Sequence, residues 1–335
     1  MPRGVDDYGE VRVTAPARLH LGFVDMHGGL GRRFGSLGLT LDGIATTVRA
    51  HPSDRLTAAG PMADRALAAA RLLGERLGLS TTAALTVDQA IPQHVGLGSG
   101  TQLGLAVGAA LGRLRGEPAR IQDIAGVLER GARSGIGIGA FRDGGVILDG
   151  GRGPGPEPPP VIARLPFPES WRVLLILHRD GQGLHGSAEA AAFRDLPPFP
   201  AAAAAHLCRL TVMSALPALA EGDADGFGRA VGELQRTVGD HFAPFQGGRF
   251  TSPDVAAVLG WLESQGIPGV GQSSWGPTGF AIVGDPDRAE ALLDTARRRW
   301  RGSPLTFRLC RGRNRGADIE PAVQPAFGHV NATND

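Results

Sequence analysis

The chain contains no lysine, since all 34 basic residues among its 335 positions are arginines. This absence excludes a Schiff-base lysine, and it excludes a P-loop, whose motif ends in Gly-Lys-Ser or Gly-Lys-Thr. Any cationic side chain that contacts a phosphate or a carboxylate must be an arginine, which can bind such groups with two parallel hydrogen bonds.

Cysteine, net charge and long apolar runs are equally scarce. Cys208 and Cys310 lie far apart and form no C-x-x-C pair, so we expect reduced core residues of a cytoplasmic protein. A net charge of +1 favours neither nucleic acid nor an acidic membrane surface as a partner. Residues 1–10 are polar and acidic, unlike a signal peptide, and the longest uncharged run, around residues 91–112, is too rich in glycine to predict a membrane span.

Glycine, in contrast, is abundant at 51 residues, and its densest arrangement lies in residues 91–115. A turn containing Pro92 leads into a loop, and a helical spacing of apolar residues follows, with Ser99 or Thr101 as the expected N-cap. Small side chains let backbone N–H groups approach a ligand, and a helix N-terminus adds free donors and partial positive charge. The sequence therefore predicts an anion site, most often for phosphate, in a loop made of Gly96, Leu97, Gly98, Ser99, Gly100 and Thr101. The alternative is a glycine turn that only lets the helix pack closely on a sheet.

The dinucleotide-binding fingerprint does not fit this loop. It needs G-x-G-x-x-G between two strands of a βαβ unit, whereas these glycines read G-x-G-x-G. The residues after the helix, 121–133, are expected to form a second helix instead of a strand. A Rossmann unit is therefore excluded.

Three further glycine-rich segments carry polar residues. These segments are residues 16–43, with Asp25, Arg32 and Arg33; residues 131–145, with Arg133 and Ser134; and residues 269–283, with Ser273, Ser274 and Trp275.

Alternating and helical spacings predict a mixed chain. The expected strands are residues 10–13, 19–23, 37–41, 46–50, 83–87, 146–149, 171–177, 279–283 and 305–309. The expected helices are residues 62–79, the stretch after the glycine loop, 121–133, 201–220 with an interruption near Pro217, 226–238, 254–265 and 287–299. A connector rich in proline and glycine at residues 150–160 indicates a domain boundary, which gives domains at residues 10–160 and 161–313 and a tail at residues 314–335.

The central loop resembles the P-x-x-x-G-L-G-S-S/G motif of the GHMP superfamily of small-molecule kinases, which Pro92 and residues 96–100 match position by position. In that family the loop wraps the diphosphate of a nucleotide, and two further motifs correspond here to residues 16–25 and 269–280. The resemblance implies a two-domain α+β GHMP fold. Its N-terminal domain is similar to domain 2 of ribosomal protein S5, its C-terminal domain is ferredoxin-like, and the active site lies in the cleft between them.

Longer segments resemble one branch of that superfamily, the β-ribofuranosylaminobenzene 5′-phosphate synthases. The branch has P-[SA]-R-[IL]-H near its start and an Asp seven residues before an Arg, which residues 16–20, Asp25 and Arg32 match. Its R-S-G-I-G and G-G-[FV]-[IV]-[LV]-D-G-G segments match residues 133–137 and 144–151. The branch condenses 5-phosphoribosyl diphosphate with 4-aminobenzoate in methanopterin biosynthesis and releases diphosphate and CO2. The resemblance therefore implies a pentosyltransferase with small-molecule substrates.

This resemblance also implies roles for individual residues. Residues 96–101 bind the diphosphate, and Asp25 and Arg32 are catalytic. Mg²⁺ is the expected cofactor, with Asp25 as a ligand. ATP is not expected, because Trp275 and Pro277 make the third loop bulkier than the G-x-G-G-G of the kinases. The expected substrate-binding residues are Arg18, His20, Arg33, Arg133, Ser134, Gln246, Arg249, Ser273, Ser274 and Trp275. We also expect a homodimer.

Simpler interpretations stay open for several of these residues. Asp25 is also an ordinary turn residue at a strand end, Arg32 and Arg33 are also typical of solvated surface arginines, and His20 is also typical of a hydrogen-bonded strand residue. For the whole chain, the alternatives are an ATP-dependent small-molecule kinase of the same superfamily and a non-catalytic metabolite sensor.

Overall fold

The computed structural model describes residues 9–184 and 186–321. Its strands are β1 (Val11–Asp25), β2 (Phe34–Pro52), β3 (Thr57–Ala59), β4 (Ala83–Gln89), β5 (Val146–Asp149), β6 (Val161–Leu165), β7 (Arg172–His178), β8 (Val270–Gln272), β9 (Gly279–Val283), β10 (Leu305–Cys310) and β11 (Asp318–Pro321). Its helices are α1 (Ala63–Leu77), α2 (Ser99–Leu114), α3 (Ile121–Val127), α4 (Ile136–Arg142), α5 (Gly186–Asp195), α6 (Ala201–Leu210), the π-helical η1 (Thr211–Ala215), α7 (Leu216–Glu221), α8 (Ala224–Gln246), α9 (Pro253–Ser264) and α10 (Pro286–Arg299).

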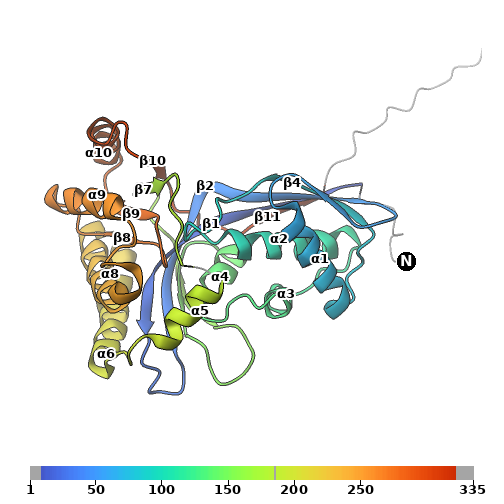
Figure 1. Ribbon diagram of the computed structural model, residues 1–335, viewed down its shortest axis with the longest axis horizontal. Coiled ribbons are helices and arrows are strands. Elements are labelled where there is room, and N and C mark those ends of the chain that lie inside the picture. Colours follow the sequence, from blue (N-terminus) through green and yellow to red (C-terminus); the bar gives the residue numbers. More distant parts are fainter. Residues whose placement is uncertain (1–8, 185, 322–335) are drawn as a thin grey trace, which may run out of the picture.

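The strands form two sheets, one in each half of an elongated molecule (Figure 1). The first sheet has the order β11-β1-β2-β4-β3, and β5 extends it by pairing with both β2 and β6. The second sheet has the order β10-β7-β9-β8. Helices α1, α2 and α3 share a hydrophobic cluster with the first sheet, and α9 and α10 share one with the second. The expected combination of helices and strands in two parts is confirmed.

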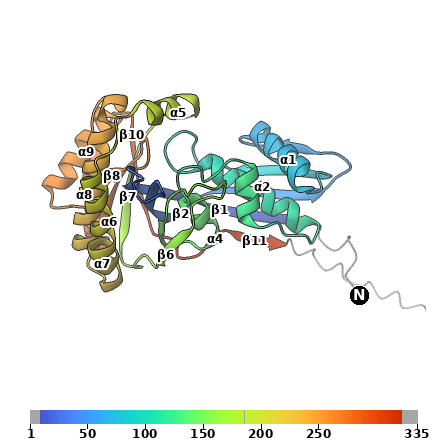
Figure 2. The same ribbon diagram turned by 90° about the horizontal axis from the view of Figure 1, so that it is seen from below.

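The four short strands expected in residues 10–50 are in fact two long ones. β1 has 15 residues and β2 has 19, and they pair antiparallel along most of their length. Irregularities after Pro16 and after His20 let β1 bend without ending. The hairpin therefore continues out of the first half and contacts α8 in the second half (Figure 2).

The helix expected at residues 121–133 is shorter than the sequence predicts. It ends with α3, and Glu129 and Gly131 then adopt positive φ angles of 52° and 87°, which no α-helix contains. The following glycine segment forms a helix of its own, α4, which the sequence does not predict. The R-S-G-I-G segment is thus the entry to a helix.

The long apolar helix expected at residues 201–220 is present, with one wider turn, η1, between α6 and α7. Pro217 has no N–H to donate to the carbonyl of Met213, and its ring crowds that carbonyl, which a wider turn accommodates. By length and composition alone Ala201–Glu221 could cross a membrane; 33% of its most apolar window is buried inside the protein, and α7 packs against α8.

Two strand pairings cross the predicted domain limits. β6, which follows the predicted boundary at residue 160, pairs with β5 in the first sheet. β11, within the predicted tail, pairs antiparallel with the start of β1, while residues 322–335 lie outside the described part of the chain. The sequence does not predict β3, β6, β8, β11 or α5, which are short or lack a strong period.

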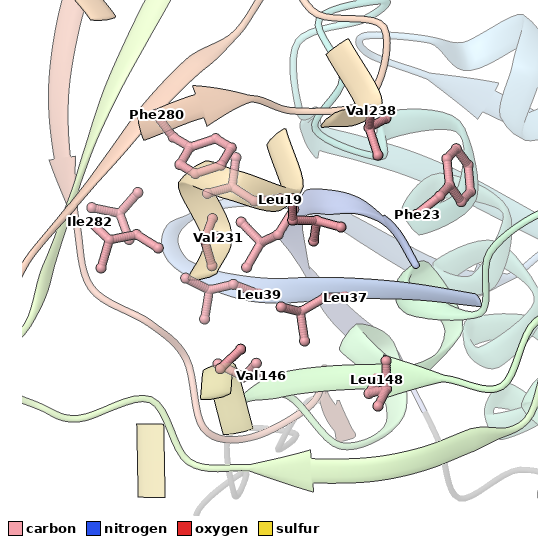
Figure 3. Packing of buried hydrophobic residues seen from close by; sticks show 14 of the residues in the cluster. Leu19, Phe23, Leu37, Leu39, Val146, Leu148, Val231, Val238, Phe280 and Ile282 are labelled. Carbon is pink, nitrogen blue, oxygen red and sulfur yellow. The ribbon is translucent and has the colours of Figure 1, made fainter. Parts of the chain in front are cut away.

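The largest hydrophobic cluster joins the two halves (Figure 3). Leu19 and Leu37 from the hairpin lie in it with Val231 of α8 and Phe280 of β9, and all four side chains are fully buried. The halves are therefore held together by a shared core, in which the β1–β2 hairpin is the common element.

We expect Gly38→Ala to destabilise the protein by roughly 1–3 kcal/mol. A Cβ at Gly38 would overlap Ile136 Cγ2 and lie 2.8 Å from the carbonyl oxygen of Leu19, which is backbone and cannot move aside. The matched control is Gly126→Ala in α3, where a Cβ meets no atom within 4 Å and where alanine favours the helix. Urea unfolding of both variants measures the two free energies, and equal values would contradict this packing argument.

Candidate active site

The three motifs, far apart in the sequence, meet at the glycine loop. The backbone N–H of Arg18 donates to the carbonyl of Leu97 at 3.2 Å, and the Arg18 guanidinium donates to the carbonyl of Gly96. From the third loop, Ser273 Oγ donates to the same Gly96 carbonyl at 2.7 Å and accepts from the backbone N–H of His20 at 2.9 Å. These contacts place β1, the glycine loop and the third loop around one point.

The glycine loop ends at the N-terminus of α2. The N-cap is Gly98, with φ 87°, so the expectation of Ser99 or Thr101 at this position is wrong. Within the described residues no side chain caps the first turn, so its N–H groups keep their capacity for a ligand. Gly96 also has a positive φ, and a Cβ there would overlap the carbonyl of Ser273. The loop therefore allows close backbone approach, and the free N–H groups of α2 keep the predicted anion site geometrically possible.

A cleft of about 370 Å³ opens above this helix N-terminus and is lined by three arginines, so we call it the arginine cleft. Arg18 is one of the predicted residues, whereas Arg65 of α1 and Arg130 after α3 are not predicted. A Cβ added at Gly100 would lie 3.3 Å from Arg65 Nη2 and 3.6 Å from Arg130 Nη1, so both guanidinium groups lie beside the first turn of α2. No motif surrounds Arg65 or Arg130, so the sequence offers no signal for them.

Arg18 and Arg130 are packed closely enough to be partly desolvated, whereas Arg65 is exposed. Burial lowers the pKa of Arg18 to about 10, with the carboxylate of Glu189 acting in the opposite direction. Burial also lowers the pKa of Arg130, and the nearby charge of Arg65 adds to this effect. Arg130 Nε is buried and has no hydrogen-bond partner among the described residues. An anion that entered the cleft would meet positive charge with little water around it.

Arg133 and Ser134 lie at the entry to α4 and are positioned by a buried carboxylate to which the sequence patterns assign no role. Asp149 accepts hydrogen bonds from Ser36 Oγ at 2.5 Å, from Ser134 Oγ at 3.3 Å and from the backbone N–H of Gly135 at 2.9 Å. Burial raises the pKa of Asp149, and these hydrogen bonds act against that rise. The aspartate of the D-G-G segment therefore orders the backbone that follows Arg133.

An aromatic cluster fills the space between Arg133 and the third loop. Its members are Phe23 of β1, Phe34 of β2, Phe193 of α5, Phe242 of α8 and Trp275 of the third loop. Trp275 stacks on Phe242 with ring centroids 4.2 Å apart and an interplanar angle of 16°. The guanidinium of Arg133 lies 4.5 Å from the centroid of the Phe193 ring.

His20 lies beside this cluster, with its ring centroid 4.5 Å from that of Phe23. It is 4% exposed, and its Nε2 has no hydrogen-bond partner among the described residues. Burial, followed by the positive charge of Arg18, lowers the pKa of His20 to about 3, so the imidazole is neutral at physiological pH.

Gln246, Arg249 and Ser274 line a small cavity of about 20 Å³ together with His20. The Arg249 guanidinium is held by Asp240, with Nε 2.7 Å from Oδ1, and Gln246 donates to the carbonyl of Arg249 at 2.8 Å. Ser274 also lines the arginine cleft, so it lies at the boundary between that cleft and the small cavity.

Asp25, Arg32 and Arg33 line a different, largely apolar cavity of about 230 Å³. Within residues 9–184 and 186–321, this apolar cavity and the arginine cleft share no lining residue. Asp25 Oδ1 accepts from the N–H groups of His27 and Gly28, both at 2.9 Å, as in a local turn.

The two arginines also make backbone contacts. Arg32 donates to the carbonyls of Gly150 and Gly151, each at 2.7 Å, and Arg33 donates to the carbonyl of Met26 at 2.9 Å. The structure does not bring these predicted residues into the arginine cleft, although Asp25 lies directly across the strand pair from Phe34 of the aromatic cluster.

Two family models match the chain. The GHMP kinases N terminal domain matches residues 64–144, and the GHMP kinases C terminal model matches residues 215–302. The beta-ribofuranosylphenol 5'-phosphate synthase of Methanothermobacter thermautotrophicus is 31% identical over 332 residues, covering 92% of this chain and 98% of the relative. The protein of the same name from Archaeoglobus fulgidus is 31% identical and covers 92% of this chain and 99% of its own length.

Solved structures share the architecture. A homoserine kinase from Cytophaga hutchinsonii aligns with a TM-score of 0.66 at 17% identity, over 94% of this chain and 98% of that one. A mevalonate diphosphate decarboxylase from Staphylococcus aureus aligns with a TM-score of 0.64 at 14% identity, over 94% and 99% of the two chains. At these identities the likeness concerns the fold alone, and the fold expected from the sequence is confirmed.

The neutral, buried His20 predicts a pH dependence of stability. Its pKa in the folded state, about 3, lies below the unfolded value near 6.5, so the unfolded chain binds more protons between these pH values. The stabilisation is complete above pH 6.5 and is lost as the pH falls, by up to about 1.4 kcal/mol per pH unit. His20→Gln cannot take up this proton. The difference in unfolding free energy between wild type and variant should therefore shrink by about 2.7 kcal/mol from pH 7.5 to 4.5 in urea titrations. A difference that stays constant would refute the neutral assignment.

Proposed function

Because this chain belongs to the family of the beta-ribofuranosylphenol 5'-phosphate synthases and has the GHMP fold, we propose that it is a pentosyltransferase that uses 5-phosphoribosyl diphosphate. The acceptor is a benzoate with an amino or hydroxyl group in the para position, and diphosphate and CO2 are released. The relatives are named for a phenol product, whereas the resemblance of the motifs points to an aminobenzene product in methanopterin biosynthesis. Both 4-hydroxybenzoate and 4-aminobenzoate are therefore acceptors to test.

The observation that carries this proposal is the arginine cleft at the start of α2. Uncapped N–H groups and the guanidinium groups of Arg18, Arg65 and Arg130 converge on one space of about 370 Å³. Backbone donors and planar guanidinium groups are the partners that phosphate oxygens prefer in proteins. A diphosphate with its ribose suits this cleft by charge and by size.

In the proposed reaction the bond between ribose C1 and the diphosphate oxygen breaks, and the diphosphate leaves with the electron pair. The ring carbon that bears the carboxylate attacks C1, and loss of CO2 then restores the aromatic ring. Negative charge grows on the leaving diphosphate, so donors that are already aimed at it stabilise the transition state. The chain needs to supply no covalent nucleophile.

Mg²⁺ fits this cleft only as an ion that arrives with the diphosphate. The described residues contain no group of three or more His, Cys, Asp or Glu side chains that could hold a metal by themselves. Mg²⁺ typically keeps several waters and binds through substrate phosphates and one or two carboxylates. When bound, it would neutralise charge on the diphosphate. Asp25 as a ligand remains a prediction, although the described structure places it in a separate cavity from this cleft. The homodimer and the cytoplasmic location also remain predictions.

The third loop supports a transferase over a kinase of the same fold. Trp275 is 3% exposed and stacks on Phe242, so this loop contributes a bulky ring to the aromatic cluster. A loop built in this way has little room for a nucleotide. ATP is therefore the competing ligand in the test that follows.

The test mixes purified protein with 5-phosphoribosyl diphosphate, Mg²⁺ and each acceptor, and follows diphosphate and CO2 together. We expect equal rates of release only when both substrates are present. Arg130→Ala should raise the KM for 5-phosphoribosyl diphosphate about tenfold or more, because a hydrogen bond to a charged group contributes about 1.5–3 kcal/mol. The matched control is Arg71→Ala, an exposed arginine on α1. Stabilisation by ATP with no release of CO2 would replace the proposal with a kinase.

Asp25 and Arg32 remain our predicted catalytic pair, and Asp25→Asn tests the first of them. Asparagine keeps an oxygen that can accept from His27 and Gly28, so the turn should persist while the negative charge is removed. We expect turnover to fall about 100-fold, as for loss of a charge that stabilises the transition state, with an unchanged melting temperature. Turnover close to wild type would make Asp25 a turn residue only.

A further inference from the structure

Helix α5 lies between the two halves of the molecule (Figure 1) and buries few of its side chains against them. Among its described residues, Ala192 is the fully buried one, and most of the others are exposed. Two side chains are exceptions, because they turn inward on the same face. Glu189 and Phe193 are four residues apart, so they lie one above the other on the helix.

The Phe193 ring sits inside a cage of four aromatic side chains. Its centroid lies 5.9 Å from that of Phe23, 5.6 Å from Phe34, 5.7 Å from Phe242 and 5.4 Å from Trp275. All four contacts are edge-to-face, with interplanar angles of 81–89°. This is a favourable arrangement for holding one flat ring.

Arg133 covers this ring and also binds the carboxylate of the same helix. Its guanidinium lies 4.5 Å from the Phe193 centroid, and its Nη1 lies 3.2 Å from Glu189 Oε1. One arginine therefore contacts an aromatic ring and a carboxylate at the same time. An aromatic carboxylic acid presents these two groups in a single small molecule.

The walls of the cage do not depend on α5. Phe23 and Phe34 come from the β1–β2 hairpin, Phe242 comes from α8, and Trp275 comes from the third loop. The backbone after Arg133 is held by Asp149 through Gly135. The cage and its arginine can therefore keep their places when the helix moves away.

We propose that the cage is the subsite for the aromatic carboxylate acceptor, and that Phe193 and Glu189 of α5 occupy it until the acceptor displaces them. This inference rests on the proposed function, because it names the place of the acceptor in that reaction. The acceptor ring replaces the Phe193 ring between the four aromatic side chains, and its carboxylate replaces Glu189 on Arg133. α5 is thus an internal competitor, and the affinity for the acceptor is reduced by the fraction of molecules in which the helix is seated.

The experiment is calorimetric titration of the full chain with 4-aminobenzoate and with 4-hydroxybenzoate, without 5-phosphoribosyl diphosphate. Phe193→Ala removes the competing ring, and Glu189→Gln removes the competing charge while keeping the ring and the shape. If the helix is seated in about nine molecules of ten, each variant should bind the acceptor up to about tenfold more tightly. The matched control is Arg194→Ala, an exposed residue of the same helix that pairs with Asp195, which should bind like wild type.

Two results would overturn the proposal. Weaker or unchanged binding by Glu189→Gln, which does not disturb packing, would mean that the carboxylate does not compete. Weaker or unchanged binding by a folded Phe193→Ala would mean that the ring is a wall of the site or unrelated to it. As a further arm, 4-aminobenzamide keeps the ring but lacks the carboxylate. Because Glu189→Gln raises the fraction of molecules in which the helix is unseated, it should tighten the binding of this ligand by the same factor, and no gain would count against the proposal.

The outcome separates this inference from the proposed function. Tighter binding in both variants without release of diphosphate and CO2 would leave the subsite in place and remove the transferase reaction. Release of both products, with an acceptor KM raised by both variants, would leave the reaction in place and remove the internal competitor.

Discussion

The site depends on two hydrogen bonds that the carbonyl oxygen of Gly96 accepts. This oxygen accepts from the Arg18 guanidinium on β1 and from Ser273 Oγ in the third loop, so a single backbone atom joins all three motifs. The approach is possible because position 96 has a positive φ and no side chain, since a Cβ would overlap the carbonyl of Ser273. The loop whose sequence is typical of a ligand cradle is thus also the joint between the two halves.

Around that joint the chain places its charge and its aromatic rings in separate compartments. Arg18, Arg65 and Arg130 lie on the side of α2, where partial burial of Arg18 and Arg130 strengthens their attraction for an anion. The aromatic side chains lie on the side of α8 and α5, and Arg133 stands between the two groups. A reaction that joins a diphosphate-bearing sugar to an aromatic ring needs such a division, because one substrate requires donors and the other requires apolar walls.

Part of this arrangement could be predicted. The glycine loop, the third loop and the R-S-G-I-G segment are runs of neighbouring residues, so the sequence alone is enough for their patterns to indicate a site. Arg65 and Arg130 could not be found in this way, because no motif surrounds either residue and each comes to lie beside the first turn of α2 only in the folded chain. Asp25 and Arg32 show the opposite case, since their motif is distinctive but their side chains serve a turn and two carbonyls, apart from the arginine cleft.

The sequence by itself determined what depends on neighbouring residues: most helix and strand periods, the glycine loop that leads into α2, and arginine in place of lysine at every basic position. Only the tertiary structure decided which arginines face that loop, and that Phe193 lies among Phe23, Phe34, Phe242 and Trp275. The physical reason is that these contacts join residues up to 170 positions apart in the chain, as Phe23 and Phe193 are. Their distances follow from the packing of two sheets on a shared core, and no local spacing records them.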